Sequence, residues 1–193
     1  MMKIILLGDS LFARDEGKVE PHINFSLKRL IPDLVITNLA ESGDNSIDLL
    51  AKLAKWDFPV VDKVFVWIGT NDLATHKQIY LGEFQENMRQ ISSILLERYQ
   101  PSQLIFLGPT PVDETKQRYR TNRLVTYYSE IVEKVAREAK CDFLSVQDLM
   151  TDSPIPLPEL LRGSMDDGLH FGSVGYELLA EKLEEYIKKK PGL

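Results

Sequence analysis

Four polar clusters interrupt the apolar runs of this 193-residue sequence, and their side chains could take part in nucleophilic catalysis. They are Gly8-Asp9-Ser10, Glu41-Ser42-Gly43-Asp44, Gly69-Thr70-Asn71-Asp72 and Asp166-Asp167-Gly168-Leu169-His170. A serine hydroxyl becomes a useful nucleophile only when a neighbouring base removes its proton, and histidine commonly serves as that base. Ser10 is therefore the candidate nucleophile if one of the three histidines can reach it.

His170 is the histidine whose neighbours best fit the role of that base. Asp167 precedes it by three residues across Gly168, so a tight turn can bring the carboxylate to Nδ1–H while Nε2 faces Ser10. Asp166 is the alternative partner for the imidazole. These residue types predict a triad in which the histidine accepts the serine proton and the aspartate orients the histidine.

Three donors near these residues could bind the negative charge that develops on a carbonyl oxygen during attack. The backbone N–H of Ser10 lies beside the reaction, Gly43 has no Cβ and lets its N–H approach closely, and the Asn71 carboxamide is a neutral side-chain donor. Losing one such donor typically lowers turnover by about a hundred- to a thousandfold. Ser10, Gly43 and Asn71 therefore form the predicted oxyanion hole.

The apolar runs predict a parallel sheet that is covered by helices on both faces. Strands are expected at residues 3–7, 34–38, 64–68, 104–107 and 143–146, where the apolarity is continuous rather than alternating. Helical spacing predicts helices at 45–55, 84–96 and 124–139, and a last helix from the N-cap Ser173 to a stop at Pro191 and Gly192. This alternation predicts a three-layer α/β/α sandwich with a five-stranded sheet, formed by residues 1–193 as a single domain.

The expected topology also says where the polar clusters should lie. Ligands of open α/β sheets bind beyond the carboxyl ends of the strands, at a point where the strand order reverses. The four polar clusters follow the first, second, third and fifth predicted strands. We therefore expect all four to converge at one edge of the sheet.

Composition narrows the classes of function that fit. The net charge is -6 and the only basic run, residues 188–190, falls at a helix end, so no nucleic-acid partner is expected. We expect no membrane span, because no apolar run approaches ~20 residues, and no signal peptide, because the apolar residues 4–7 run directly into Gly8-Asp9-Ser10. The single cysteine, Cys141, cannot form an intramolecular disulfide, which fits a cytoplasmic protein. No cofactor is expected.

Four motifs resemble those of the SGNH (GDSL-type) hydrolase family: Gly8-Asp9-Ser10-Leu11, Gly43, Gly69-Thr70-Asn71-Asp72 and Asp167-Gly168-Leu169-His170. The resemblance implies a nucleophile at Ser10, a base at His170, a triad aspartate at Asp167, and oxyanion donors at Gly43 and Asn71. It also implies a flavodoxin-like fold and an esterase or acylhydrolase activity on a small-molecule ester. Each motif alone is common, but their joint order is specific.

Each of these residues also has a simpler interpretation. Ser10 could be an N-cap for the segment after the first strand, Gly43 a turn glycine, and Asn71 a cap for the helix after the third strand. His22 has no carboxylate at a useful spacing, and His76 falls in an expected surface loop or helix start. The catalytic interpretation is favoured because the residues occur together.

Two other classes of function remain as alternatives. Asp9, Asp44, Asp72 and Asp167 could gather around a hard cation, as in a metal-dependent phosphoesterase, although we expect Asp9 and Asp72 to bond loop backbone instead. A flavodoxin-like module could instead bind a nucleotide without catalysis. The acidic segment after Ser10 argues against a phosphate cradle there.

Substrate choice is expected to depend on three loops, residues 11–21, 109–119 and 151–165. The apolar stretch 155–161 could form a wall for an acyl chain, or it could simply pack over the sheet edge. Small or medium acyl groups are favoured because no large lid segment is evident. Thioesters, lysophospholipids and sugar acetates use the same chemistry and stay open as substrates.

Overall fold

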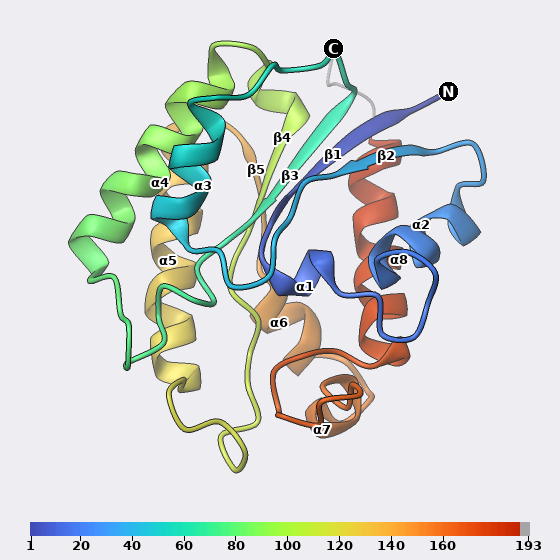
Figure 1. The fold of residues 1–193 in the computed structure, drawn as a ribbon, viewed down its shortest axis with the longest axis vertical. Coiled ribbons are helices and arrows are strands. Elements are labelled where there is room, and N and C mark those ends of the chain that lie inside the picture. The colour runs from blue at the N-terminus through green and yellow to red at the C-terminus, as the bar shows by residue number, and fades with distance from the viewer. Residues whose placement is uncertain (190–193) are drawn as a thin grey trace.

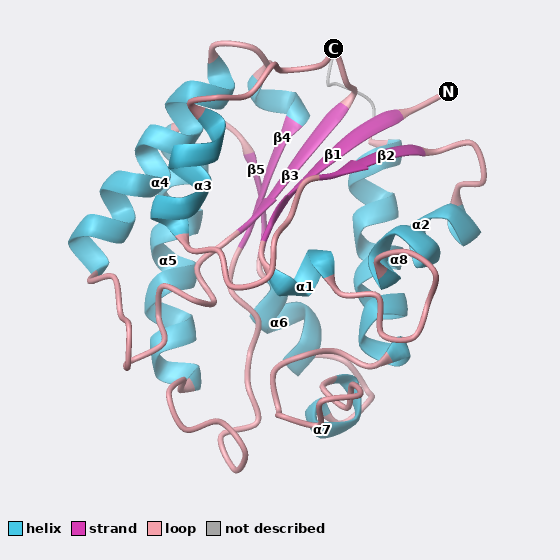
Figure 2. Ribbon diagram, viewed as in Figure 1, coloured by secondary structure: helices cyan, strands magenta, loops and turns pink. Residues whose placement is uncertain are grey.

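Continuous apolarity in the strands is explained by a parallel sheet that is buried on both faces. The computed structural model describes residues 1–189 and places a five-stranded parallel sheet between two layers of helices (Figures 1 and 2). The strand order is β2-β1-β3-β4-β5. The strands are β1 Lys3–Gly8, β2 Val35–Asn38, β3 Lys63–Trp67, β4 Leu104–Leu107 and β5 Asp142–Leu144. The predicted three-layer sandwich is thus confirmed.

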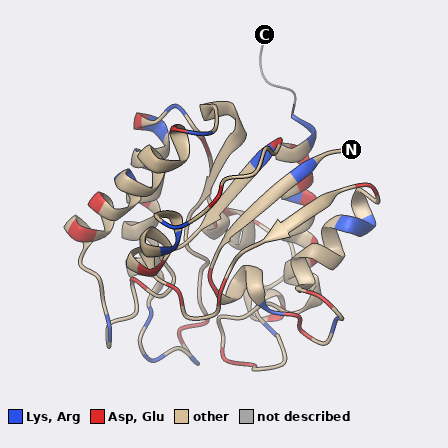
Figure 3. Ribbon diagram, turned by 45° about the horizontal axis from the view of Figure 1, so that its top comes forward, with Lys and Arg blue, Asp and Glu red and all other residues tan. Residues whose placement is uncertain are grey.

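Two helices cover one face of the sheet and three cover the other (Figure 1). The first face carries α2 His22–Leu30 and α8 Ser173–Lys188, and the second carries α3 Ser46–Leu53, α4 Leu81–Leu96 and α5 Asn122–Glu138. Short helices lie in the connections: α1 Ser10–Ala13, η1 Pro101–Gln103, α6 Val146–Thr151 and α7 Leu157–Leu160. Charged residues of both signs are interspersed over the helices and loops (Figure 3).

Alternate residues of the interior strand β1 fill two different cores. Ile4 and Leu6 pack with the α2 and α8 side, whereas Ile5 and Leu7 pack with the α3, α4 and α5 side. All four are at most 1% exposed, as expected when neighbouring side chains of a strand point to opposite, covered faces.

Two predicted boundaries were wrong, and each has a local cause. The fifth strand ends at Leu144 because the Ser145 side chain accepts a hydrogen bond from Asp148 N (3.1 Å) and caps α6, which makes Val146 helical. The N-cap of α8 is Gly172, because the Ser173 hydroxyl is hydrogen-bonded to the imidazole of His22. The predicted stop at Pro191 and Gly192 lies outside the described residues.

The strand order puts the switch point beside β1. A 2-1-3-4-5 order is the flavodoxin-like arrangement, in which the chain first adds β2 on one side of β1 and then β3 on the other. The loops after β1, β2 and β3 therefore meet at one edge. Within residues 1–189, no helix combines the length and the apolar character needed to cross a membrane.

Candidate active site

Ser10 is placed by the transition from β1 into the short helix α1. Asp9 is the N-cap of α1, and its Oδ1 accepts a hydrogen bond from Leu11 N at 2.9 Å. Ser10 is therefore the first helical residue and not a cap, and its N–H has no acceptor within the helix. Its Oγ lies 2.9 Å from Nε2 of His170, a residue 160 positions further along the chain.

His170 is held by Asp167 through both its side chain and its backbone. Its Nδ1 lies 2.8 Å from Asp167 Oδ2, while Oδ1 accepts the N–H groups of Leu169 and His170 at 3.0 Å each. A carboxylate only accepts, so Nδ1 carries the proton and Nε2 is free to accept from the Ser10 hydroxyl. Partial burial opposes ionisation of Asp167, but these hydrogen bonds outweigh it and lower its pKa well below the usual range.

A left-handed turn brings Asp167 back to His170. Gly168 between them has φ +72°, a conformation that favours glycine. A Cβ at this position would lie 2.9 Å from Asp113 Cβ, and the Gly168 carbonyl accepts a hydrogen bond from Asp113 N at 2.8 Å. The loop after β4 thus packs tightly against the turn that carries His170.

The structure does not bring the other two histidines or the alternative aspartate into this arrangement. His22 is a buried residue of α2 whose ring nitrogens lie 3.1 Å from Ser26 Oγ and 3.0 Å from Ser173 Oγ. His76 is exposed and stacks on Tyr119. Asp166 points away to Lys116, with which it forms an ion pair at 2.5 Å.

Asn71 follows β3 and faces the loops after β1 and β2. Its Nδ2 donates to the Asp44 carbonyl at 2.8 Å and lies 3.5 Å from Asp9 Oδ2. Asn71 does not cap a helix, since α4 begins ten residues later at Leu81 with Tyr80 as its N-cap. One of its two amide protons is used on Asp44, and the second makes only a long hydrogen bond to Asp9 Oδ2, which a ligand oxygen can replace.

Gly43 lies in a turn of the loop after β2. Its φ of +92° favours glycine, and a Cβ added there would meet no atom of residues 1–189 within 4 Å. No acceptor among the described residues takes its N–H. The loop is tied to the end of β1, because Glu41 N donates to the Gly8 carbonyl at 3.1 Å. Gly43 is therefore a turn glycine with a free donor at the same sheet edge as Ser10.

Two residues that contact this site were not foreseen from the sequence. Arg120 donates from Nη2 to Asn71 Oδ1 at 3.2 Å, and Gln117 donates from Nε2 to the Asp167 carbonyl at 2.6 Å. Both belong to the loop after β4, which carries no family motif. In the sequence, Gln117 and Arg120 appear only as two polar residues three positions apart. Such pairs are common on any protein surface, so they do not indicate a functional site.

The aspartates of the alternative metal site are engaged separately. Within residues 1–189, no three His, Cys, Asp or Glu side chains are grouped so that they could hold a metal ion. Asp44 pairs with Lys52 at 2.5 Å, and Asp72 accepts from Ser46 N at 3.0 Å. Asp9 and Asp72 thus bond backbone N–H groups, as predicted.

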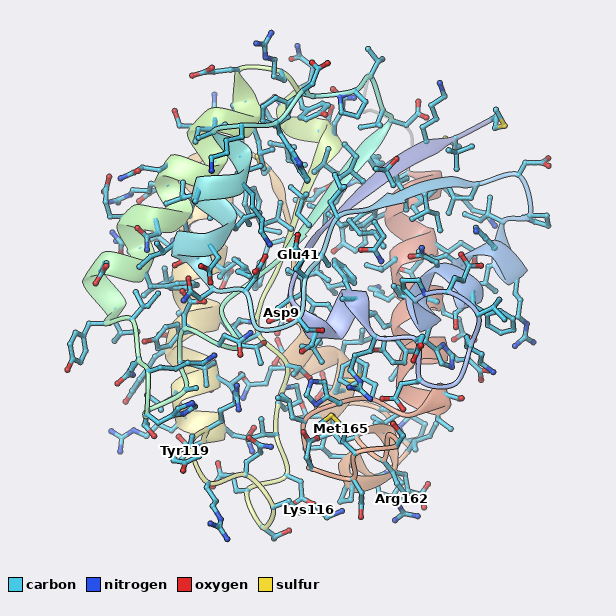
Figure 4. All side chains as sticks on the ribbon, in the orientation of Figure 1. Asp9, Glu41, Lys116, Tyr119, Arg162 and Met165 are labelled. Atoms are coloured by element: carbon cyan, nitrogen blue, oxygen red, sulfur yellow. The ribbon has the colours of Figure 1, made fainter. Side chains whose placement is uncertain are left out.

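The apolar stretch 155–161 contributes mainly to the core. Leu160 and Leu161 are at most 1% exposed and belong to the core on the α2 and α8 side, with Ile155 and Leu157 packed against it. Packing therefore explains these side chains without an acyl chain. Figure 4 labels Asp9 after β1 with Glu41 just above it, and shows Tyr119, Lys116, Met165 and Arg162 below them, where the loop after β4 and the segment after α7 lie.

Comparison with known proteins identifies relatives across nearly the whole chain. A GDSL esterase/lipase of Arabidopsis thaliana is 28% identical over 97% of this chain and 86% of its own length. The isoamyl acetate-hydrolyzing esterase of Saccharomyces cerevisiae is 27% identical over 74% of this chain and 63% of its own length. The crystal structure of a lipase/acylhydrolase from Enterococcus faecalis has a TM-score of 0.82, is 27% identical and covers 100% of both chains.

The class that these features define is a carboxylic ester hydrolase with an α/β/α sandwich fold. More narrowly, the chain belongs to the GDSL-like lipase/acylhydrolase family, whose model matches residues 6–178. The resemblance read from the four sequence motifs is thereby confirmed. The match runs from β1 into α8, so it includes every loop that reaches the candidate site.

Proposed function

We propose that this protein hydrolyses carboxylic esters of small acyl groups through an acyl-enzyme on Ser10. The observation that carries the proposal is the continuous hydrogen-bonded chain from Ser10 Oγ to His170 Nε2 (2.9 Å) and from Nδ1 to Asp167 Oδ2 (2.8 Å). Both distances are those of normal hydrogen bonds, so the three groups are already aligned for proton transfer.

The chemistry proceeds in two half-reactions. In the first, His170 Nε2 takes the hydroxyl proton while Ser10 Oγ bonds to the ester carbonyl carbon, and the tetrahedral intermediate then expels the alcohol, which receives that proton. In the second, water gives a proton to Nε2 and attacks the acyl group, and the bond to Ser10 Oγ then breaks to release the carboxylic acid while Oγ takes that proton back from Nε2. Asp167 stabilises the imidazolium in both.

Three donors are assigned to the oxyanion: the N–H groups of Ser10 and Gly43 and the second amide proton of Asn71. Their support is that the Ser10 and Gly43 N–H groups have no acceptor among residues 1–189 and that the second Asn71 amide proton makes only the long 3.5 Å bond to Asp9 Oδ2, while their loops are fixed to one another. A prearranged donor set of this kind stabilises the transition state without reorganisation.

A small acyl group is supported by two findings. The apolar stretch 155–161, one candidate for a wall beside the acyl chain, packs mainly into the core instead. The yeast relative is named for hydrolysis of isoamyl acetate, an ester with a two-carbon acyl group. We therefore expect the specificity constant to fall as the acyl chain lengthens.

The test is a panel of p-nitrophenyl esters from acetate to octanoate, together with isoamyl acetate. We expect the largest kcat/KM for the shortest acyl chains, and Ser10→Ala and His170→Ala to lower kcat by about a thousandfold or more. A fluorophosphonate should inactivate the enzyme with its adduct on Ser10. His76→Ala is the matched histidine control and should keep full activity. Activity in Ser10→Ala would overturn the proposal.

A further inference from the structure

Arg120 lies between the two halves of the candidate site and bonds both to the loop after β3 and to its own loop after β4. The partly buried guanidinium donates from Nε to the Thr70 carbonyl at 2.8 Å, from Nη2 to Asn71 Oδ1 at 3.2 Å, and from Nη1 to Gln117 Oε1 at 3.2 Å. It thus holds the backbone and the side chain of two consecutive residues after β3. A planar fork with several donors is suited to such multiple contacts.

The contact to Asn71 selects one orientation of its carboxamide. A guanidinium has only donors, so it requires the oxygen of the amide, whereas the Asp44 carbonyl requires the nitrogen. Both partners therefore demand the same orientation, with Nδ2 on the side of Asp9 and Asp44. In the flipped orientation an oxygen would face the developing oxyanion and repel it.

The positive charge also strengthens Asn71 as a donor. A charged N–H that bonds to an amide oxygen polarises the amide and makes its N–H groups better donors, because hydrogen bonds in a chain reinforce one another. Burial lowers the pKa of Arg120, but an arginine in a protein keeps its proton. The charge is therefore present at any pH at which the fold persists.

Gln117 extends the contact to the loop that carries the base. Its Oε1 accepts from Arg120, and its Nε2 donates to the Asp167 carbonyl at 2.6 Å. Three groups, Asn71, Arg120 and Gln117, thus connect the oxyanion side of the site to the turn that positions His170. The distance between donor and base is consequently set through side chains of one loop.

We propose that Arg120 is a positioning residue for the esterase reaction. It holds the Asn71 carboxamide with Nδ2 toward the substrate oxyanion and, through Gln117, fixes the place of Asn71 relative to Asp167. This inference rests on the proposed function, in which Asn71 donates to the oxyanion. A purely structural arginine would instead stabilise the loop after β4 without acting through Asn71.

The experiment is a double-mutant cycle between Arg120→Met and Asn71→Ala, read as kcat and KM on p-nitrophenyl acetate. Arg120→Met removes all donors and should lower kcat roughly ten- to a hundredfold with KM changed less than about threefold. In the Asn71→Ala background the same change should lower kcat less than about threefold, because its target is gone. Arg123→Met is the control, since Arg123 is exposed on α5 and bonds Tyr127.

The outcomes separate this inference from the proposed function. If Asn71→Ala keeps wild-type kcat, the oxyanion assignment itself fails. If Asn71→Ala lowers kcat about a hundredfold, and adding Arg120→Met lowers kcat further by the same factor as it does in the wild type, the two effects are independent. Arg120 then acts elsewhere, and only the present inference is overturned. Should Arg120→Met not fold, Arg120→Lys replaces it, and the NMR resonances of the Asn71 side-chain amide are compared with those of the wild type. Unchanged Asn71 resonances overturn the inference. Displaced resonances together with a lower kcat support it.

Discussion

Asp9 is a fully buried carboxyl group beside Ser10, the proposed nucleophile. It caps α1 through Oδ1, and its second oxygen lies 3.5 Å from Asn71 Nδ2. Burial raises its pKa to about 7, although the hydrogen bond from Leu11 N and the charge of Arg120 oppose this. The folded protein therefore holds a proton on Asp9 more tightly than the unfolded chain does.

This difference predicts a dependence of stability on pH. Because the pKa of Asp9 is raised from 3.8 to about 7, its contribution to stability is fully present below pH about 4 and is lost as pH rises through about 7. We expect the free energy of unfolding of the wild type, relative to Asp9→Asn, to decrease between pH 5 and pH 8 in urea titrations. The exposed Asp33 supplies the control Asp33→Asn. A constant difference across this range would contradict the assignment.

At the scale of single residues, the sequence predicts the site residues that belong to motifs. It does not predict the residues that reach the site only through a side-chain contact with a distant part of the chain. Ser10 and Asn71 follow strand ends, and Asp167 and His170 lie in the connection that enters α8, so topology indicates that all four can meet at one edge of the sheet. Arg120 contacts a residue 49 positions away through a long side chain, and neither periodicity nor a motif indicates which way such a side chain turns.

At the scale of elements, the turn 166–170 is constrained both in its backbone conformation and in the space around it. Gly168→Ala should lower the free energy of unfolding by about 1–3 kcal/mol, because alanine is strained at φ +72° and its Cβ would press on Asp113. The displaced turn should also lower kcat. Urea unfolding and kcat on p-nitrophenyl acetate measure both effects.

Gly82 offers a control of opposite sign. It lies in α4, and a Cβ there would meet no atom of the described chain within 4 Å, so Gly82→Ala should stabilise the protein by roughly 0.5–1 kcal/mol through helix propensity. An equal decrease in the free energy of unfolding in Gly168→Ala and Gly82→Ala would show that the turn 166–170 carries no special strain.

Long elements were predictable and short ones were not. The five strands and the helices α3, α4, α5 and α8 have continuous apolar runs or helical stripes, and their predicted positions agree with the structure to within a few residues. The four-residue helices α1 and α7 are too short to show a period. They form because the cap Asp9 starts α1 and because the leucines at the end of α7 are drawn into the core.

At the scale of the whole molecule, the sheet separates two apolar cores. Trp67 lies in the core beside α2 and α8, where it packs edge-on to Phe12, and Trp56 packs against the opposite core. All five strands lie in one sheet, so loss of either core removes the support of the other face. We therefore propose that the chain unfolds as a single domain.

Tryptophan fluorescence tests this proposal. Trp56→Phe leaves Trp67 as reporter of one core, and Trp67→Phe leaves Trp56 as reporter of the other. In each variant the urea midpoint from fluorescence should coincide with that from far-UV circular dichroism, as a cooperative transition requires. Separate midpoints would mean that the two layers unfold independently.

The interior position of β1 has a consequence for the order in which the site can form. Ser10 is synthesised before residues 35–38 and 63–67, which pair with the two edges of its strand, and before His170, the proposed base. During synthesis Ser10 is thus held on a sheet that is still open and without its proposed proton acceptor. Ester hydrolysis should begin only when the C-terminal part of the chain has closed over the sheet, so the order of translation itself delays activity until folding is nearly complete.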